Sequence, residues 1–200
     1  MDMGNSMIAL PEIDPDEDFL NIPVKKSRFP IITSSQLVTY LTHPELCCYD
    51  TVVLADTRFE YEYSGGFIKN ATNIVKKEHI IALYNKWETK NVLIVFYCDV
   101  FKTRSMHVAS IFHNYDSKVN YPNTFFPHIM ILNDGYENFY SSHPDLCEKG
   151  CIRMRDDFYI RNGELKHQNS NFVSEILYRG KLPRCCSVKF SCPTLGSPFP

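Results

Sequence analysis

The chain has 200 residues, of which 44 % are hydrophobic and 22 % are charged, and its formal net charge is −2. This composition is typical of one folded domain with short tails, and it excludes two large domains, a disordered chain and a fibrous one. The near-neutral charge gives no bulk attraction to nucleic acid or to an anionic membrane, so neither is expected as a partner.

Residues 1–28 are rich in acidic side chains and have no hydrophobic period, so we expect a flexible acidic leader. The first residues lack the basic start and the apolar stretch of a secretory signal. The longest apolar run, 92–98, is too short to span a bilayer. We therefore expect a protein of the nucleus and cytoplasm whose eight cysteines are mostly reduced thiols.

Strands and helices are predicted to alternate after the leader. Thr33 and Gln36 form a capping box that predicts the start of a short helix. Later helices are expected over 76–87, 104–115 and 134–140, and strands over 51–56, 71–74, 91–97 and 128–132. Gly65 and Gly66 are expected to form a turn. The alternation predicts an α/β fold with a parallel sheet covered by helices on both faces.

The folded body is predicted to span residues 29–157. Basic residues outnumber acidic ones over 158–200, and the end of the chain is rich in Pro, Gly and Ser. This segment is therefore expected to be basic and partly disordered. Its stretch from Arg161 to Lys189 is a candidate docking surface for a protein partner.

A Cys-x5-Arg motif, Cys98 to Arg104, lies between the predicted strand 91–97 and the next helix. A loop of this length can turn its backbone N–H groups inward, and the start of the helix adds positive potential, so the loop suits a tetrahedral oxyanion such as phosphate. The same field is expected to lower the pKa of Cys98, and Arg104 can bind two phosphate oxygens. These are the parts of a cysteine-dependent phosphatase, which needs neither a metal nor another cofactor.

Two cysteines, Cys98 and Cys147, also have interpretations that involve no catalysis. The alternative for Cys98 is that it is a buried cysteine that only packs at the end of a strand. A second match to the motif, Cys147 to Arg153, follows no predicted strand, and we interpret it as a coincidence.

His143, Cys147 and Cys151 are spaced four residues apart, as metal ligands on a helix can be. Pro144 and Gly150 interrupt such a helix, and the chain has no Cys-x2-Cys pair, so no zinc site is expected.

Four collinear blocks of the sequence, at 54–74, 95–99, 121–132 and 134–140, resemble the rhodanese-like family, and in particular its M-phase inducer phosphatases. The block LADTRFEYEYSGGFIKNATNI (54–74) is similar to the Asp-x-Arg, Glu-Tyr and Gly-His-Ile elements of that family. The blocks 95–99, 121–132 and 134–140 follow in the family's order. The resemblance covers about 29–157 and implies a rhodanese-like, parallel five-stranded sheet with helices on both faces.

The resemblance also implies an activity. Similarity to the M-phase inducer phosphatases implies a dual-specificity protein phosphatase that dephosphorylates phosphothreonine and phosphotyrosine of a cyclin-dependent kinase bound to its cyclin, through a phosphocysteine intermediate, and so promotes entry into mitosis. The seven-residue loop separates them from sulfurtransferase rhodaneses, whose loop is one residue shorter.

The family's roles are carried over to the matching positions. Cys98 takes the place of the nucleophile and Arg104 that of the phosphate clamp. The phosphate-binding amides are expected to be those of Asp99, Val100, Phe101, Lys102, Thr103 and Arg104. Asp99 is also a candidate general acid, with a solvated loop carboxylate as the alternative. Asp56 and Arg58 are expected to form a structural pair beneath the loop.

Several positions depart from the family pattern. Tyr97 replaces the usual His, which removes one contributor to a low thiol pKa. Lys102, in place of a small residue, is a candidate to help attract phosphate. Thr57 replaces a second cysteine that can protect the nucleophile in a disulfide. Two other functions remain open: a rhodanese-type sulfurtransferase or arsenate reductase, and a catalytically weak pseudophosphatase that acts as a binding module.

Overall fold

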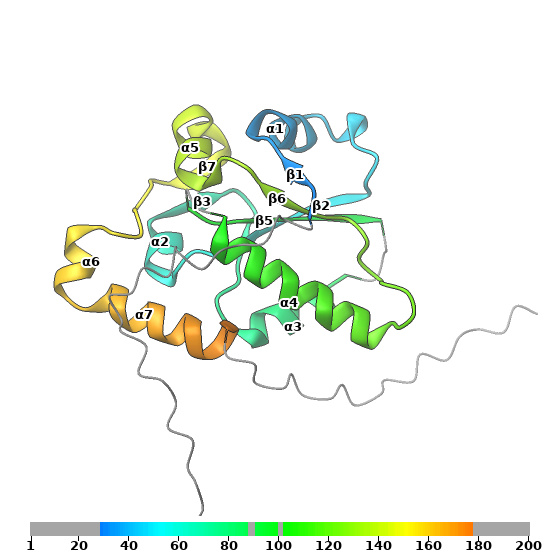
Figure 1. The fold of residues 1–200 in the computed structure, drawn as a ribbon. Coiled ribbons are helices and arrows are strands. Elements are labelled where there is room, and N and C mark those ends of the chain that lie inside the picture. The colour runs from blue at the N-terminus through cyan, green and yellow to red at the C-terminus, as the bar shows by residue number, and fades with distance from the viewer. Residues whose placement is uncertain (1–28, 88–90, 100–101, 178–200) are drawn as a thin grey trace, which may run out of the picture.

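The computed structural model describes residues 29–87, 91–99 and 102–177 (Figure 1). Strands and helices alternate along most of this part of the chain. In order they are β1 (Ile31–Ile32), α1 (Ser34–Thr42), β2 (Thr51–Asp56), α2 (Glu60–Gly65), β3 (Gly66–Ile68), β4 (Thr72–Asn73), α3 (Lys77–Asn85), β5 (Val92–Tyr97), α4 (Thr103–Val119), β6 (Ile129–Leu132), α5 (Gly135–Ser142), β7 (Cys147–Lys149), α6 (Asp157–Arg161), α7 (Glu164–Phe172) and the π-helical turn η4 (Val173–Leu177).

Five parallel strands among the described residues form the main sheet, in the order β1-β6-β5-β2-β4. The central pair, β2 and β5, is in register from Thr51 opposite Val92 to Asp56 opposite Tyr97. Every residue of β5 is buried, as expected for a strand of a parallel sheet with both faces covered. The predicted α/β class and the five-stranded parallel sheet are therefore confirmed.

The side chains of β5 alternate between two hydrophobic cores, because successive residues of a strand point to opposite faces. The first core contains Val92, Ile94 and Phe96, with residues of α3, α4 and α7. The second contains Leu93, Val95 and Tyr97, with residues of α1 and α5. Figure 1 shows α1 and α5 on one side of the sheet and α3 and α4 on the other.

The capping box predicted at Thr33 is present at the start of α1. The strand 51–56 is confirmed as β2, and α4 continues four residues beyond the predicted end at 115. Helix α2, which ends at Gly65, was not predicted from the sequence. Gly66 then begins β3, so the expected Gly65-Gly66 turn is wrong.

Glycine is required at Gly66 because β3 approaches another segment closely there. A Cβ atom at this position would lie 1.7 Å from the carbonyl oxygen of Gly150. The segments meet because β3 pairs antiparallel with β7. This small second sheet brings residues 147–151 close to the segment that follows β2.

The described structure continues beyond residue 157, where the folded body was predicted to end. Residues 157–177 form α6, α7 and η4, and Phe172 and Ile176 are 2 % and 3 % exposed in the first core. Because burying an apolar side chain of this size contributes about 1.5–3 kcal/mol, these residues belong to the domain. The acidic leader (1–28) and the end of the basic segment (178–200) lie outside the described residues. No helix within the described ranges is long and apolar enough to cross a membrane.

Candidate functional site

The Cys-x5-Arg motif has the predicted strand-loop-helix setting. β5 ends at Tyr97, Cys98 follows directly, and α4 begins at Thr103, so Arg104 lies in the first turn of the helix. Cys98 and Arg104 are 2 % and 6 % exposed. Val100 and Phe101, two of the predicted phosphate-binding residues, lie outside the described residues.

The sulfur of Cys98 contacts the start of α4. Its Sγ–H donates to the hydroxyl oxygen of Ser105 at 3.6 Å, and that hydroxyl donates to the carbonyl of Lys102 at 2.9 Å. The carbonyl of Cys98 accepts a 2.9 Å hydrogen bond from the N–H of Tyr136 in α5. Cys98, the candidate nucleophile, is therefore held between two helices at the carboxyl end of the sheet.

The pKa of Cys98 is raised, whereas the sequence analysis expected it to be lowered. Burial is the largest cause, because it disfavours the charged thiolate. Arg104 and the hydroxyl and backbone N–H of Ser105 act in the opposite direction, and Glu62 adds a further increase. The sequence showed the positive groups of the motif but not the buried carboxylate beside them.

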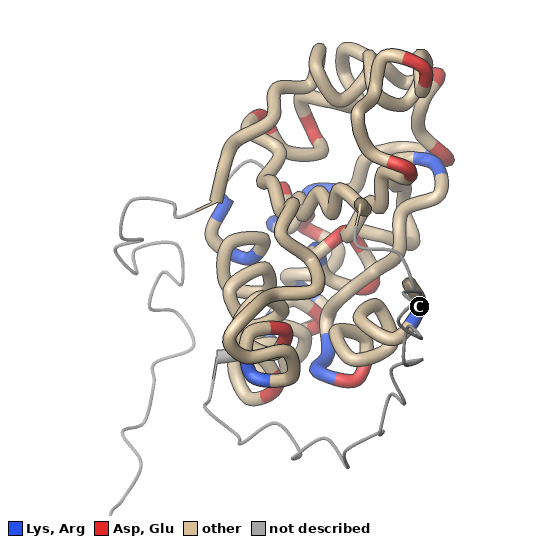
Figure 2. The backbone as a smooth tube through the Cα atoms, turned by 90° about the vertical axis from the view of Figure 1, so that its right-hand side faces the viewer, with Lys and Arg blue, Asp and Glu red and all other residues tan. Residues whose placement is uncertain are grey.

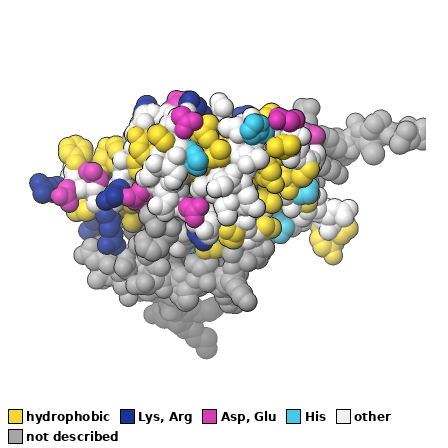
Figure 3. Space-filling model, turned by 90° about the horizontal axis from the view of Figure 1, so that it is seen from above, with side chains coloured by type: hydrophobic (Ala, Val, Ile, Leu, Met, Phe, Trp, Pro, Cys, Tyr) yellow, Lys and Arg dark blue, Asp and Glu magenta, His cyan; other side chains and the backbone are white. Residues whose placement is uncertain are grey.

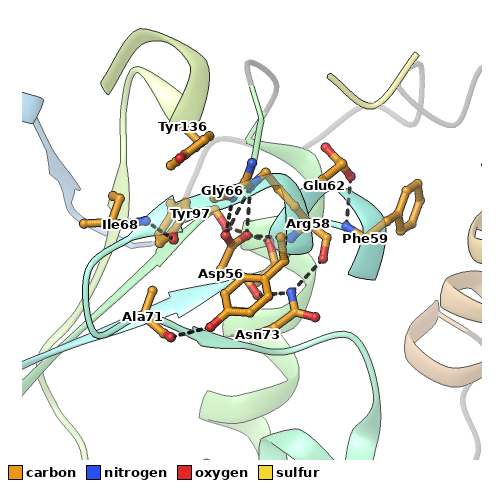
Figure 4. Close-up of polar contacts among 12 residues, drawn as sticks. Asp56, Arg58, Phe59, Glu62, Gly66, Ile68, Ala71, Asn73, Tyr97 and Tyr136 are labelled. Atoms are coloured by element: carbon orange, nitrogen blue, oxygen red, sulfur yellow. Dashed lines mark hydrogen bonds and ion pairs between the residues drawn. The ribbon is translucent and has the colours of Figure 1, made fainter. Parts of the chain in front are cut away.

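Arg104 forms a two-bond ion pair with Glu62 of α2. Nη2 lies 3.0 Å from Oε1, and Nη1 donates to Oε2, which also accepts the N–H of Phe59 at 2.8 Å. Glu62 is fully buried, and the Arg104 guanidinium lies 4.5 Å from the centroid of the Phe59 ring. Burial lowers the pKa of Arg104, but Glu62 more than offsets this, so the pKa is raised. Figure 4 shows Glu62 and its bond to Phe59.

Asp56 and Arg58 form the predicted structural pair, with no exposed side-chain surface on either residue. Arg58 Nη2 lies 2.6 Å from Asp56 Oδ2 and also donates to the carbonyl of Gly66 at 2.6 Å (Figure 4). The guanidinium lies 3.7 Å from the centroid of the Tyr136 ring. The pair thus ties the end of β2 to β3 and α5.

The side chain of Tyr97, which replaces the usual His, is fully buried in the second core. Its hydroxyl accepts from the N–H of Ile68 at 3.3 Å, and burial raises its pKa. Asp99 is half-buried, and its pKa is raised, first by burial and then by the charge of Glu62. An elevated pKa is the property that a carboxyl acid needs in order to hold a proton near neutral pH.

Lys102 and Thr103 complete the described part of the loop. Thr103 is buried at the start of α4. The ammonium of Lys102 donates to Asn133 Oδ1 at 2.5 Å, just after the end of β6. In this structure its charge is therefore bound to the protein rather than presented to a phosphate.

The second Cys-x5-Arg match is not a loop between a strand and a helix. Cys147 is the first residue of β7, and the exposed Arg153 forms an ion pair with Glu137. Burial is the main cause that raises the pKa of Cys147 to about 11. These contacts support its interpretation as a coincidence. Within the described ranges, no three His, Cys, Asp or Glu residues are grouped as metal ligands.

Glu62 and Ser105 contact the two candidate catalytic residues and were not identified from the sequence. Glu62 lies in the Glu-Tyr block that carried the resemblance, so that block was a usable signal. No feature of the sequence indicated Ser105, because its contact with Cys98 depends on the direction in which its side chain points. The charged surface offers no further guide, because basic and acidic positions are interspersed along the chain (Figure 2) and over the face seen from above (Figure 3).

Comparisons with known proteins agree with the resemblance. Residues 45–142 match the family model of the rhodanese-like domain. The chain is 36 % identical over 142 residues to the M-phase inducer phosphatase of Schizosaccharomyces pombe, a match that covers 68 % of this chain and 24 % of that protein. It is 35 % identical over 139 residues to the M-phase inducer phosphatase of Dictyostelium discoideum, which covers 66 % of this chain and 13 % of that protein. The chain thus spans no more than about a quarter of these relatives.

One solved structure that matches this chain is that of a yeast protein tyrosine phosphatase of the rhodanese family. It is 14 % identical in sequence, with a TM-score of 0.49, and the match covers 63 % of this chain and 96 % of that one.

Proposed function

This chain belongs to the rhodanese-like family, and we propose that it is a cysteine-dependent, dual-specificity protein phosphatase like its M-phase inducer relatives. The observation that carries the proposal is the placement of Cys98 and Arg104. Both side chains lie at the carboxyl end of β5, on either side of one short loop that opens α4. Backbone N–H groups and a helix start at this position suit a phosphate group.

The proposed reaction has two steps. The thiolate of Cys98 attacks phosphorus, a sulfur–phosphorus bond forms, and the bond from phosphorus to the substrate oxygen breaks. Asp99 is the candidate donor of the proton that this leaving oxygen requires. Water then attacks the phosphocysteine, which releases inorganic phosphate and restores the thiolate.

Arg104 can take part in both steps without leaving Glu62. The carboxylate of Glu62 uses one edge of the guanidinium, Nη1 and Nη2. No described residue accepts from Nε, so the edge that includes Nε–H remains for two phosphate oxygens. A planar guanidinium suits this role because it can bind two ligands in fixed directions.

The proposed substrate is a cyclin-dependent kinase, bound to its cyclin and phosphorylated on adjacent threonine and tyrosine. Dephosphorylation there would promote entry into mitosis, and we propose that the protein acts in the nucleus and cytoplasm. The support for this finer assignment is the name that the relatives share.

The test is hydrolysis, in the presence of EDTA, of a peptide that carries adjacent phosphothreonine and phosphotyrosine, and of the intact phosphorylated kinase. We expect phosphate release from both. Cys98→Ser should abolish release but still bind inorganic phosphate, because a hydroxyl is a much weaker nucleophile in the same loop. Cys48→Ser, at an exposed cysteine, is the matched control and should leave turnover unchanged.

Assays of the same purified protein distinguish the phosphatase from the other candidate functions. A sulfurtransferase would move sulfur from thiosulfate to cyanide through a Cys98 persulfide, and an arsenate reductase would consume arsenate and a thiol. The raised pKa of Cys98 favours the pseudophosphatase, which would bind phosphopeptide without turnover. Turnover retained in Cys98→Ser would overturn the proposed mechanism.

A further inference from the structure

A series of polar contacts connects the end of the Cys98–Arg104 loop to residues at the carboxyl end of the sheet. Lys102 Nζ donates to Asn133 Oδ1 at 2.5 Å, and Asn133 Nδ2 donates to Asp134 Oδ1 at 2.8 Å. The other carboxylate oxygen of Asp134 accepts the hydroxyl of Ser34 at 3.1 Å. Lys102 precedes α4, Asp134 precedes α5, and Ser34 is the first residue of α1. Three helix starts are therefore joined at the carboxyl end of the sheet.

The other end of the loop is held by the same segment. The N–H of Tyr136 donates to the carbonyl of Cys98 at 2.9 Å. Residues 133–136 thus contact the loop at its first residue, Cys98, and also at Lys102, two residues before its last. Two anchors on one short segment constrain the distance between Cys98 and Lys102.

The charges along this chain of contacts favour the arrangement. Burial raises the pKa of Asp134, but hydrogen bonds from Asn133 and Ser34 and the charge of Lys102 outweigh it, so the net shift is downward. Asp134 is therefore a carboxylate at neutral pH. Its negative charge attracts the Lys102 ammonium toward the end of β6.

We propose that Lys102 is a positioning residue, which through Asn133 holds the end of the Cys98–Arg104 loop where α4 begins, and does not bind phosphate itself. The inference rests on the proposed function for its consequence in turnover. A preorganised loop binds an oxyanion without the entropic cost of ordering its backbone. Loss of the anchor should therefore weaken phosphate binding and slow turnover, even though no phosphate ligand is removed.

A double-mutant cycle between Lys102→Met and Asn133→Ala tests this role. A hydrogen bond to a charged group contributes about 1.5–3 kcal/mol, and 1.4 kcal/mol is tenfold, so each single change should lower kcat/KM for a small aryl phosphate by about 10-fold or more. The double variant should be no slower than the slower single variant. Lys102→Arg should recover most of the loss, because its guanidinium can still reach Asn133.

Multiplicative losses in the double variant would overturn the proposal, because they would mean that Lys102 acts directly on phosphate. An unaffected Asn133→Ala would overturn it as well. Lys118→Met is the matched control, since it removes an exposed positive charge from the other end of α4. It should leave both kcat and KM unchanged.

Two further measurements separate this proposal from the proposed function. The same cycle is run on inorganic phosphate affinity by calorimetry in Cys98→Ser protein, and on amide hydrogen exchange at residues 102–104. We expect weaker binding and faster exchange, equal in Lys102→Met and Asn133→Ala. Absence of turnover in the wild type would defeat the phosphatase, while exchange unaltered by both variants would defeat the anchor.

Discussion

Arg104 and Glu62 form a buried ion pair of two hydrogen bonds beside the candidate phosphate site, although they are 42 residues apart in the sequence. Glu62 is fully buried and binds two nitrogens of the guanidinium, so it orients the side chain before any substrate arrives. The same carboxylate raises the pKa of Cys98. One residue therefore positions the proposed clamp and opposes ionisation of the proposed nucleophile.

We predict that Glu62→Gln lowers the pKa of the Cys98 thiol. Removal of the negative charge takes away one cause of the upward shift and leaves the positive charge of Arg104 uncompensated. The rate of alkylation by iodoacetamide, followed against pH by mass spectrometry at Cys98, measures this pKa. The midpoint of the curve should move to lower pH.

Glu60→Gln is the control for this experiment. Glu60 lies in the same helix, but it is exposed and pairs with Lys76 at 3.5 Å. Its alkylation curve should coincide with that of the wild type. A Glu62→Gln midpoint equal to or above the wild-type midpoint would contradict the electrostatic role of Glu62.

Asp99→Asn should slow hydrolysis only where the leaving group needs a proton. The pKa of Asp99 is raised, so its protonated fraction falls as pH rises through this elevated value, and acid catalysis falls with it. General acid catalysis contributes about 10²–10⁴-fold. For phenyl phosphate we expect a loss in this range and a flattened alkaline limb, whereas para-nitrophenyl phosphate should be hardly affected. Equal losses on both substrates would assign Asp99 a structural role.

The strands and longer helices were predictable from local pattern. The apolar run of β5 and the capping box at Thr33 each indicate their element from a few consecutive residues. Helix α2 was missed because its six residues are fewer than two turns, too short to show a period. The C-terminal helices were missed because Phe172 and Ile176 are isolated apolar residues in a polar segment, and only their contacts with the core reveal them.

The site was predictable where the chemistry is contiguous in the sequence. Cys98 and Arg104 lie within one seven-residue loop, and the strand before it indicated their placement. The partners of these residues come from elsewhere: Glu62 from α2 and Asn133 from the end of β6. A pKa depends on burial and on all neighbouring charges, so its direction at Cys98 could not follow from the motif alone.

Truncation after Leu177 should affect only protein substrates. The basic residues beyond this point remain the candidate docking segment, and their loss should slow the reaction with the intact kinase but spare an aryl phosphate. Truncation after Asp157 is a different experiment, because it removes two core residues. Phe172→Ala serves as its comparison and should cost about 3–5 kcal/mol of unfolding free energy. Equal losses on both substrates after removal of 178–200 would show that this segment supports the fold.

Thr57→Cys should protect the enzyme from peroxide. In the register of β2 and β5, Asp56 lies opposite Tyr97, so the next residues, Thr57 and Cys98, are neighbours across the two strands. The hydroxyl of Thr57 donates to the Tyr97 carbonyl at 2.9 Å. Adjacent strands lie about 4.8 Å apart, within the Cα separation that a disulfide spans.

The chemistry of protection is a two-electron oxidation. A peroxide oxidises the Cys98 thiolate to a sulfenic acid, the introduced thiol attacks that sulfur, and a disulfide forms as water leaves. In the wild type, the sulfenic acid should proceed to the sulfinic form, so dithiothreitol should restore activity only after short exposures. With Thr57→Cys the rescue should extend to long exposures, and Thr57→Ser should behave as the wild type.

Mass spectrometry of the oxidised wild type is the decisive measurement. Cys47 and Cys48 precede β2 at the opposite end of the sheet, about 20 Å away at the rise of a six-residue strand, and cannot reach Cys98. Cys151 is nearer, because the carbonyl of the preceding Gly150 accepts the hydroxyl of Tyr136 at 2.8 Å, and the N–H of Tyr136 donates to the carbonyl of Cys98. A stable Cys98–Cys151 disulfide would mean that Cys151 already resolves the sulfenic acid. The Thr57→Cys variant would then add no protection, and the interpretation of Thr57 as a missing partner would be wrong.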